Sequence, residues 1–177
     1  MSQNKNCYFE ALAAIEHFYG KKRAERSRVP LINHIYEGCA IIDTLCYTWF
    51  TCREHECDIL KAAFCIHPII QPDVHRPEMW KPLVEHLPPR VVELAVSYSR
   101  CANAYLCTPE NDWVSTTTDV HMKVKPHLPT RDTYILLMAD KLQNKKDFVR
   151  HHQGRHDRSK QLTFYFDLWL KYLRENA

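Results

Sequence analysis

Apolar side chains recur every three or four positions over most of the chain, which is the spacing of one buried helix face. Residues 7–19 are the clearest case, with Phe9, Leu12, Ile15 and Phe18 on one side. The same pattern predicts further helices over 34–50, 55–67, 90–106, 132–152 and 159–176. We therefore expect residues 1–177 to form a single all-α domain, a bundle of six or seven helices.

Local signals suggest where these helices begin and end. Asn33 can cap the helix over 34–50 through its side-chain oxygen. The buried stripe of that helix should comprise Ile35, Ile42, Leu45 and Trp49. Pro68 should end the helix over 55–67, because proline lacks the N–H that a helix interior needs. The proline-broken segment 71–89 is expected to hold no more than one short turn.

Composition narrows the class of protein. The chain has 177 residues, 45% apolar and 25% charged, as in one globular domain, and its three glycines disfavour turn-rich β architectures. A net charge of +3 does not indicate binding to long nucleic acid. No apolar run reaches the ~18 residues of a membrane span, and no signal peptide begins the chain. The eight cysteines form no Cys-x-x-Cys pair, so we expect reduced thiols in a cytoplasmic protein.

The basic residues gather in two segments, 21–28 and 150–160. Either segment suits contact with phosphate, and Ser159 or Asp157 could cap exposed N–H groups at the last helix. Both segments read equally as solvated basic loops. The aromatic stripe of the last helix, Phe164, Phe166, Trp169 and Tyr172, is typical of core or of a face between two copies of the chain.

Three polar residues interrupt apolar helix faces. His34 opens one predicted helix, His67 closes the next, and Asp140 follows the run "YILLMA". A buried carboxylate requires a compensating partner. A helical bundle can bring three such helices together around a metal or phosphate site. A single histidine on an apolar face is, by itself, more often a hydrogen-bonded core residue.

The segments "RVPLINH" (28–34), "AAFCIH" (62–67) and "MADKLQN" (138–144) resemble, in this order, motifs of the HD-domain phosphohydrolase superfamily. The branch with the greatest similarity is the RelA/SpoT-type alarmone hydrolase, including its small stand-alone forms. The compact length is similar to that of small phage-encoded HD proteins. This resemblance implies a location in the cytoplasm of the host cell. The resemblance implies an all-α HD fold, hydrolysis of nucleotide phosphate esters, and a divalent metal, manganese first, with zinc, iron or cobalt as alternatives.

Carried over by motif, His34, His67 and Asp140 correspond to metal ligands, and Asn144 corresponds to a residue that contacts the nucleotide sugar. Further candidates for substrate binding are Arg26, Arg28, Arg100 and Lys141.

The second motif departs from the family, because Pro68 stands where the family has a metal-binding aspartate. Gln71 and Pro72 occupy the positions of two acidic residues that activate water in the alarmone branch. Asp73 follows them, and it could supply a fourth ligand or a catalytic carboxylate if the prolines unwind the helix end. Glu37, one turn after His34, is the other candidate for tuning the water, or else a surface carboxylate.

Three functions stay open at this point. The first is a metal-dependent phosphohydrolase acting on a small phosphorylated nucleotide, either an alarmone or a deoxynucleoside phosphate. The second is a catalytically degenerate protein that binds or sequesters a nucleotide without hydrolysing it. The third is an interaction module with a vestigial pocket. Assembly into a homo-oligomer is compatible with all three.

Overall fold

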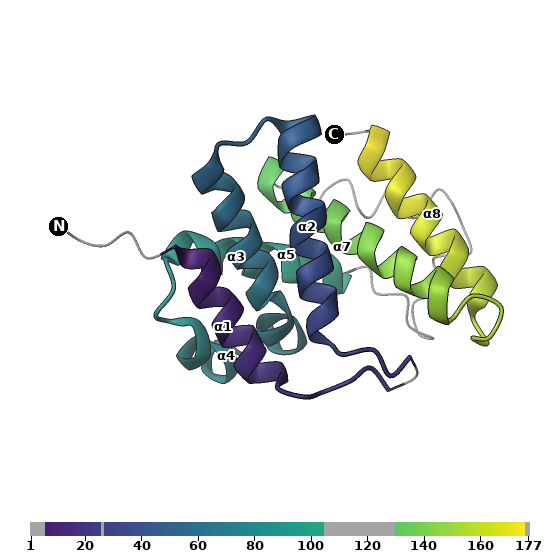
Figure 1. The fold of residues 1–177 in the computed structure, drawn as a ribbon, viewed down its shortest axis with the longest axis horizontal. Coiled ribbons are helices and arrows are strands. Elements are labelled where there is room, and N and C mark those ends of the chain that lie inside the picture. The colour runs from purple at the N-terminus through teal and green to yellow at the C-terminus, as the bar shows by residue number, and fades with distance from the viewer. Residues whose placement is uncertain (1–5, 26, 105–129, 176–177) are drawn as a thin grey trace.

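The computed structural model describes residues 6–25, 27–104 and 130–175, and this part of the chain is all-α, as predicted (Figure 1). No strand occurs in these ranges. The α-helices are α1 (Cys7–Tyr19), α2 (Ile32–Leu45), α3 (Glu54–Ile70), α4 (Pro77–Val84), α5 (Pro89–Ala104), α7 (Arg131–His151) and α8 (Ser159–Glu175). Two shorter turns are the π-helical η1 (Cys46–Phe50) and the 3₁₀-helical η2 (Gln71–Asp73).

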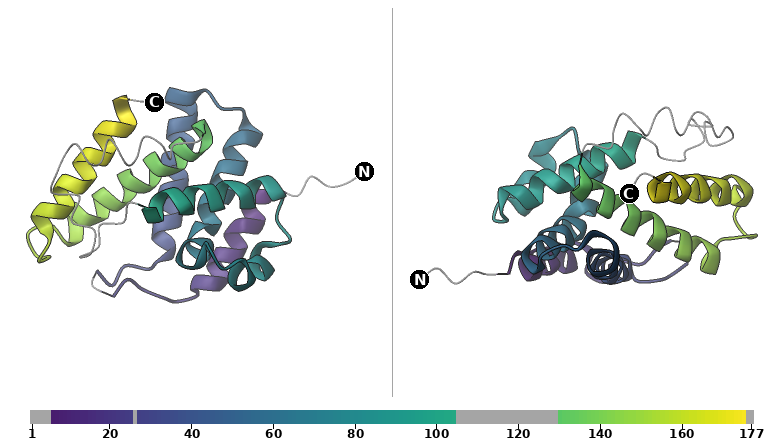
Figure 2. Two further views of the ribbon diagram at one scale, coloured as in Figure 1. Left: turned by 180° about the vertical axis from the view of Figure 1, so that it is seen from behind. Right: turned by 90° about the horizontal axis from the view of Figure 1, so that it is seen from above.

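The helix α3 lies in the middle of the bundle and packs against α1, α2 and α5. The helix α7 packs against α2 on one side and α8 on the other, so α8 lies at the edge of the molecule farthest from α1 (Figures 1 and 2). Phe64, Tyr98 and Trp169 are among the largest fully buried side chains. Among the described residues, no helix combines the length and the apolar character needed to cross a membrane.

The helix α2 differs from its prediction at both ends. It begins at Ile32, so Asn33 lies inside the first turn rather than at the cap. Leu31 occupies the cap position with helical dihedral angles, and no side chain makes a capping hydrogen bond there. Ile35, Ile42 and Leu45 are buried as expected. Trp49 is 55% exposed, and the prediction that it is buried was wrong. The wider π turn at η1 changes the helical register there and turns Trp49 out of the core face.

The helix α3 continues through Pro68 to Ile70, so the prediction that this proline ends the helix was wrong. An α-helix normally joins the N–H of residue 68 to the carbonyl of Phe64, and proline has no N–H to give. That carbonyl accepts instead from the Nδ1 of His67, at 2.6 Å. The segment 71–89 also contains more structure than expected, since η2 and all of α4 lie within it.

A close contact between α2 and α3 depends on Gly38. Any Cβ at this position would overlap the ring of Phe64. The absent side chain lets that ring lie against α2, where it stacks on the imidazole of His34 with ring centroids 5.4 Å apart. Gly38 therefore helps to set the distance between the two helices that carry the histidines.

Candidate metal centre and its pocket

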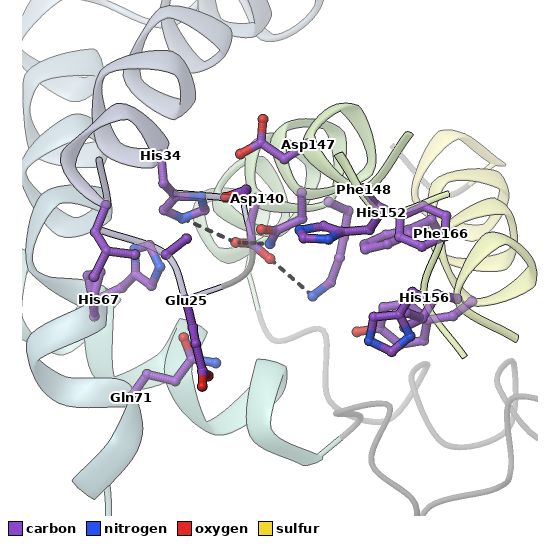
Figure 3. A pocket seen from close by; sticks show the side chains of 18 of the residues that line it. Glu25, His34, His67, Gln71, Asp140, Asp147, Phe148, His152, His156 and Phe166 are labelled. Atoms are coloured by element: carbon purple, nitrogen blue, oxygen red, sulfur yellow. Dashed lines mark hydrogen bonds and ion pairs between the residues drawn. The ribbon is translucent and has the colours of Figure 1, made fainter. Parts of the chain in front are cut away.

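Three helices bring His34, His67 and Asp140 together, as the sequence predicts (Figure 3). Each residue offers one ligand atom, and these atoms all lie within 4.8 Å of one another. The His34 Nε2 atom lies 3.6 Å from Asp140 Oδ1, and the two imidazole rings meet edge to face at 5.3 Å. His67 and Asp140 are buried and His34 is half-buried. This group could hold a metal ion, and it is the only group of its kind within the described ranges.

The protonation states of the group suit a metal ion. Burial lowers the pKa of His67 to about 3, with a further contribution from His34, so its imidazole is neutral. Burial alone would raise the pKa of Asp140, but Lys141 and His34 outweigh this effect and hold it below its usual value. A neutral imidazole and an ionised carboxylate are the forms that bind a metal.

The side chain of Gln143 orients His34. Its Oε1 atom lies 2.5 Å from His34 Nδ1, while its Nε2 donates to Glu37 at 3.1 Å and to Asp147 at 2.7 Å. Carboxylates only accept, so the amide group must turn its oxygen toward the imidazole. Nδ1 of His34 therefore carries a proton, and Nε2 is the ring nitrogen that faces Asp140.

His67 is held by main chain and by aromatic rings. Its Nδ1 donates to the Phe64 carbonyl, which leaves Nε2 as the nitrogen without the proton. Its ring lies 4.8 Å from that of Phe64 and 4.9 Å from that of Tyr98. Both histidines therefore have Nδ1 occupied, an arrangement common among metal-binding imidazoles.

Both oxygens of Asp140 accept hydrogen bonds within α7. Lys141 Nζ donates to Oδ2 at 3.0 Å and Asn144 Nδ2 donates to Oδ1 at 2.8 Å. The ammonium of Lys141 is buried beside the rings of Tyr165 and Trp169, at 5.6 and 5.2 Å. Burial alone would lower the pKa of Lys141, but Tyr165 and Asp140 raise it by a larger amount. The net pKa lies above its usual value, so the side chain stays charged. Lys141 thus places a fixed positive charge next to the histidines.

A cavity of about 980 Å³ opens from this group. Lys141, Asn144, Gln71 and Pro68 line it near the histidines, together with Tyr98. Away from them, the wall includes Phe148, Phe166, His152 and His156 (Figure 3). The two phenylalanine rings lie 5.6 Å apart and the two imidazoles 6.4 Å apart. The pocket therefore has a polar, charged end and an end with aromatic and imidazole groups.

The candidates for activating water lie in different places. Gln71 lines the cavity, but Asp73 belongs neither to its lining nor to the metal-binding group. Since α3 does not unwind at Pro68, Asp73 follows in η2 and accepts a hydrogen bond from Arg76. Glu37 is not in the lining either, and it pairs with Lys146. Its link to the site runs through Gln143.

The two arginine candidates that the structure describes do not meet at the pocket. Arg28 and Arg100 are absent from its lining, and Arg100 is exposed on α5. Arg26 and residues 105–106 of the helix predicted over 90–106 lie outside the described residues. The segment 150–160 contributes the imidazoles of His152 and His156 instead of an arginine. In the stripe of α8, Phe166, Trp169 and Tyr172 are buried, which supports its reading as core.

The sequence reading missed Gln143, which is fully buried. One signal could have found it. Gln143 lies three residues after Asp140 on the same helix, which places the two side chains on one face.

Comparison with known proteins identifies no relative of this chain. A scan against models of protein families gives no match, and searches of curated proteins and of solved structures return no significant similarity.

Proposed function

We propose that the protein is a cytoplasmic, metal-dependent phosphohydrolase acting on a small phosphorylated nucleotide, either an alarmone or a deoxynucleoside phosphate. The observation that carries this proposal is the buried group of His34, His67 and Asp140 at one end of a 980 Å³ cavity. The resemblance of three segments to HD domains supports it, and membership of that superfamily is part of the proposal. The thiols of Cys7, Cys39, Cys46, Cys52, Cys57 and Cys65 form no disulfide, which supports a reducing compartment.

Two imidazoles and one carboxylate fit a borderline divalent metal such as manganese, zinc, iron or cobalt. When bound, such an ion lowers the pKa of water and polarises a phosphoryl oxygen. The chain itself contributes the positions of the three ligands, through Gln143 for His34 and through the Phe64 carbonyl for His67.

Other residues of the pocket suit the remaining parts of a nucleotide. Lys141 supplies a fixed positive charge that neutralises phosphoryl oxygens. Phe148 and Phe166 offer aromatic faces for a base, and His152 and His156 offer hydrogen bonds at the same end. Gln71 can hydrogen-bond to the substrate or to water beside His67.

A second candidate function is binding or sequestration of a nucleotide without hydrolysis. It is favoured by the two hydrogen bonds that Asp140 already accepts and by the distance of Asp73 from the group. The charge of Lys141 next to the histidines could then receive a phosphate directly.

A turnover screen separates the two functions. Metal-stripped protein is resupplied with manganese, cobalt or zinc and incubated with alarmones and with ribo- and deoxynucleoside mono- and triphosphates, and products are separated by chromatography. We expect metal-dependent loss of one nucleotide, abolished by His67→Ala and preserved by Asp73→Asn, because Asp73 lies outside the group. Retention of a nucleotide without turnover with any metal would establish the second function instead.

A further inference from the structure

We propose that Pro68 is a positioning residue: by withholding a main-chain N–H, it leaves the Phe64 carbonyl for the imidazole of His67 and so presents Nε2 of His67 to the metal. This inference rests on the proposed role of His67 as a ligand. It gives a use to the residue that stands where a ligating aspartate would be expected.

The argument starts from helix geometry. Each N–H of an α-helix donates to the carbonyl four residues earlier, so residue 68 faces the carbonyl of residue 64. Pro68 lies inside α3 and cannot donate, and a proline ring also crowds the carbonyl four residues before it. At this place the Phe64 carbonyl accepts from His67 Nδ1 at 2.6 Å. The Nδ1–H of His67, the residue immediately before Pro68, thus replaces the main-chain donor that proline lacks.

The position of the proton on His67 follows from this bond. A carbonyl only accepts, so Nδ1 carries the proton and Nε2 keeps the lone pair. The imidazole is buried, and it is packed between the rings of Phe64 and Tyr98, so no bulk water competes for Nδ1. With any other residue at position 68, the main-chain N–H would compete for the same carbonyl.

A structural role alone predicts something different. Proline destabilises a helix interior, so replacement by alanine should leave the thermal stability unchanged or raise it. Loss of metal affinity in a variant that is no less stable would therefore report on the orientation of His67 rather than on the fold. The helix α4 offers a matched control, because Pro82 also lies inside a helix, is exposed, and does not line the pocket.

The experiment measures the dissociation constants of Mn²⁺ and Zn²⁺ by competition with a chromophoric chelator. The proteins compared are wild type, Pro68→Ala and Pro82→Ala. We expect affinity to fall about tenfold in Pro68→Ala, the loss typical of removing a partner that orients a ligand. Pro82→Ala should match the wild type. Equal affinity in all three proteins would overturn the inference.

A second measurement does not depend on metal. In metal-free protein labelled with ¹⁵N-histidine, the nitrogen shifts of His67, assigned with a His67→Gln variant, report which ring nitrogen carries the proton. We expect a single Nδ1–H tautomer in the wild type and a mixture in Pro68→Ala. An unchanged tautomer in the variant would also overturn the inference. Absence of metal binding in the wild type would instead count against the proposed function, and the tautomer would still test the role of Pro68.

Discussion

Among individual residues, Asp140 is the one on which the buried charge of the pocket depends. Its carboxylate and the ammonium of Lys141 are each about 5% exposed, and they contact one another at 3.0 Å. Removing one partner of such a pair leaves the other charge buried without compensation, and the cost exceeds the value of the pair itself. The buried ammonium of Lys141 therefore needs the negative charge of Asp140, as a bound metal ion would.

The first prediction concerns Asp140→Asn. This variant should lose metal binding, and its free energy of unfolding should fall by about 3 kcal/mol because Lys141 keeps a buried charge. Urea denaturation measures the loss. The double variant Asp140→Asn/Lys141→Met is the control, and it should regain most of the stability without regaining metal binding. A single variant as stable as the wild type would show that Lys141 does not need this partner.

Single-residue reasoning from the sequence found the three candidate ligands but not the residues that orient them. His34, His67 and Asp140 stand out because each is a polar residue in an apolar helix face, which is a local signal. The bond from Gln143 to His34 joins residues 109 positions apart, and it depends on how α2 and α7 pack. The effect of Pro68 on α3 was predicted wrongly, because the rule for proline in helices considers only main-chain hydrogen bonds. It does not consider that the side chain of His67 can donate to the carbonyl that proline leaves without a main-chain donor.

At the scale of elements, the spacing of α2 and α3 is set by a missing side chain. All of the described α-helices except α4 followed from apolar periodicity, and α1 matches its predicted bounds of 7–19. What periodicity could not reveal is the approach of Phe64 to Gly38, because contacts between helices depend on side-chain shape. The π turn that exposes Trp49 could not be predicted either, because it changes the number of residues per helical turn on which the apolar pattern depends.

The second prediction concerns Gly38→Ala. In an open helix this change stabilises by up to about 1 kcal/mol, because alanine is the better helix former. Here the new methyl group overlaps the Phe64 ring, so we expect a net loss of roughly 1–3 kcal/mol of unfolding free energy. Guanidinium denaturation gives the value. In a Phe64→Leu background the same change should cost clearly less, and an equal cost there would contradict the steric explanation.

At the scale of the whole molecule, the candidate site joins segments from distant parts of the chain. The candidate ligands come from α2, α3 and α7, and the pocket wall adds residues of α5 and α8. A metal ion bound here would connect the consecutive helices α2 and α3 with α7, which comes much later in the sequence. Binding to the folded state alone stabilises that state.

The third prediction follows from this linkage. Free metal at about 100 times its dissociation constant adds about 2.7 kcal/mol to the unfolding free energy, which should raise the melting temperature by about 5–10 °C. Differential scanning fluorimetry with Mn²⁺, Zn²⁺ or Co²⁺ measures the shift, and excess EDTA should reverse it. His34→Ala should show no shift. A shift of equal size in that variant would place the metal elsewhere.

The position of α8 at the edge of the bundle has a consequence for synthesis of the chain. The three candidate ligands exist once α7 has left the ribosome, but Tyr165 and Trp169, which cover the ammonium of Lys141, are made later. A nascent chain that ends between these two helices would contain all three candidate ligands but neither of the aromatic rings that cover Lys141. The three candidate ligands are therefore synthesised before the aromatic residues that cover Lys141.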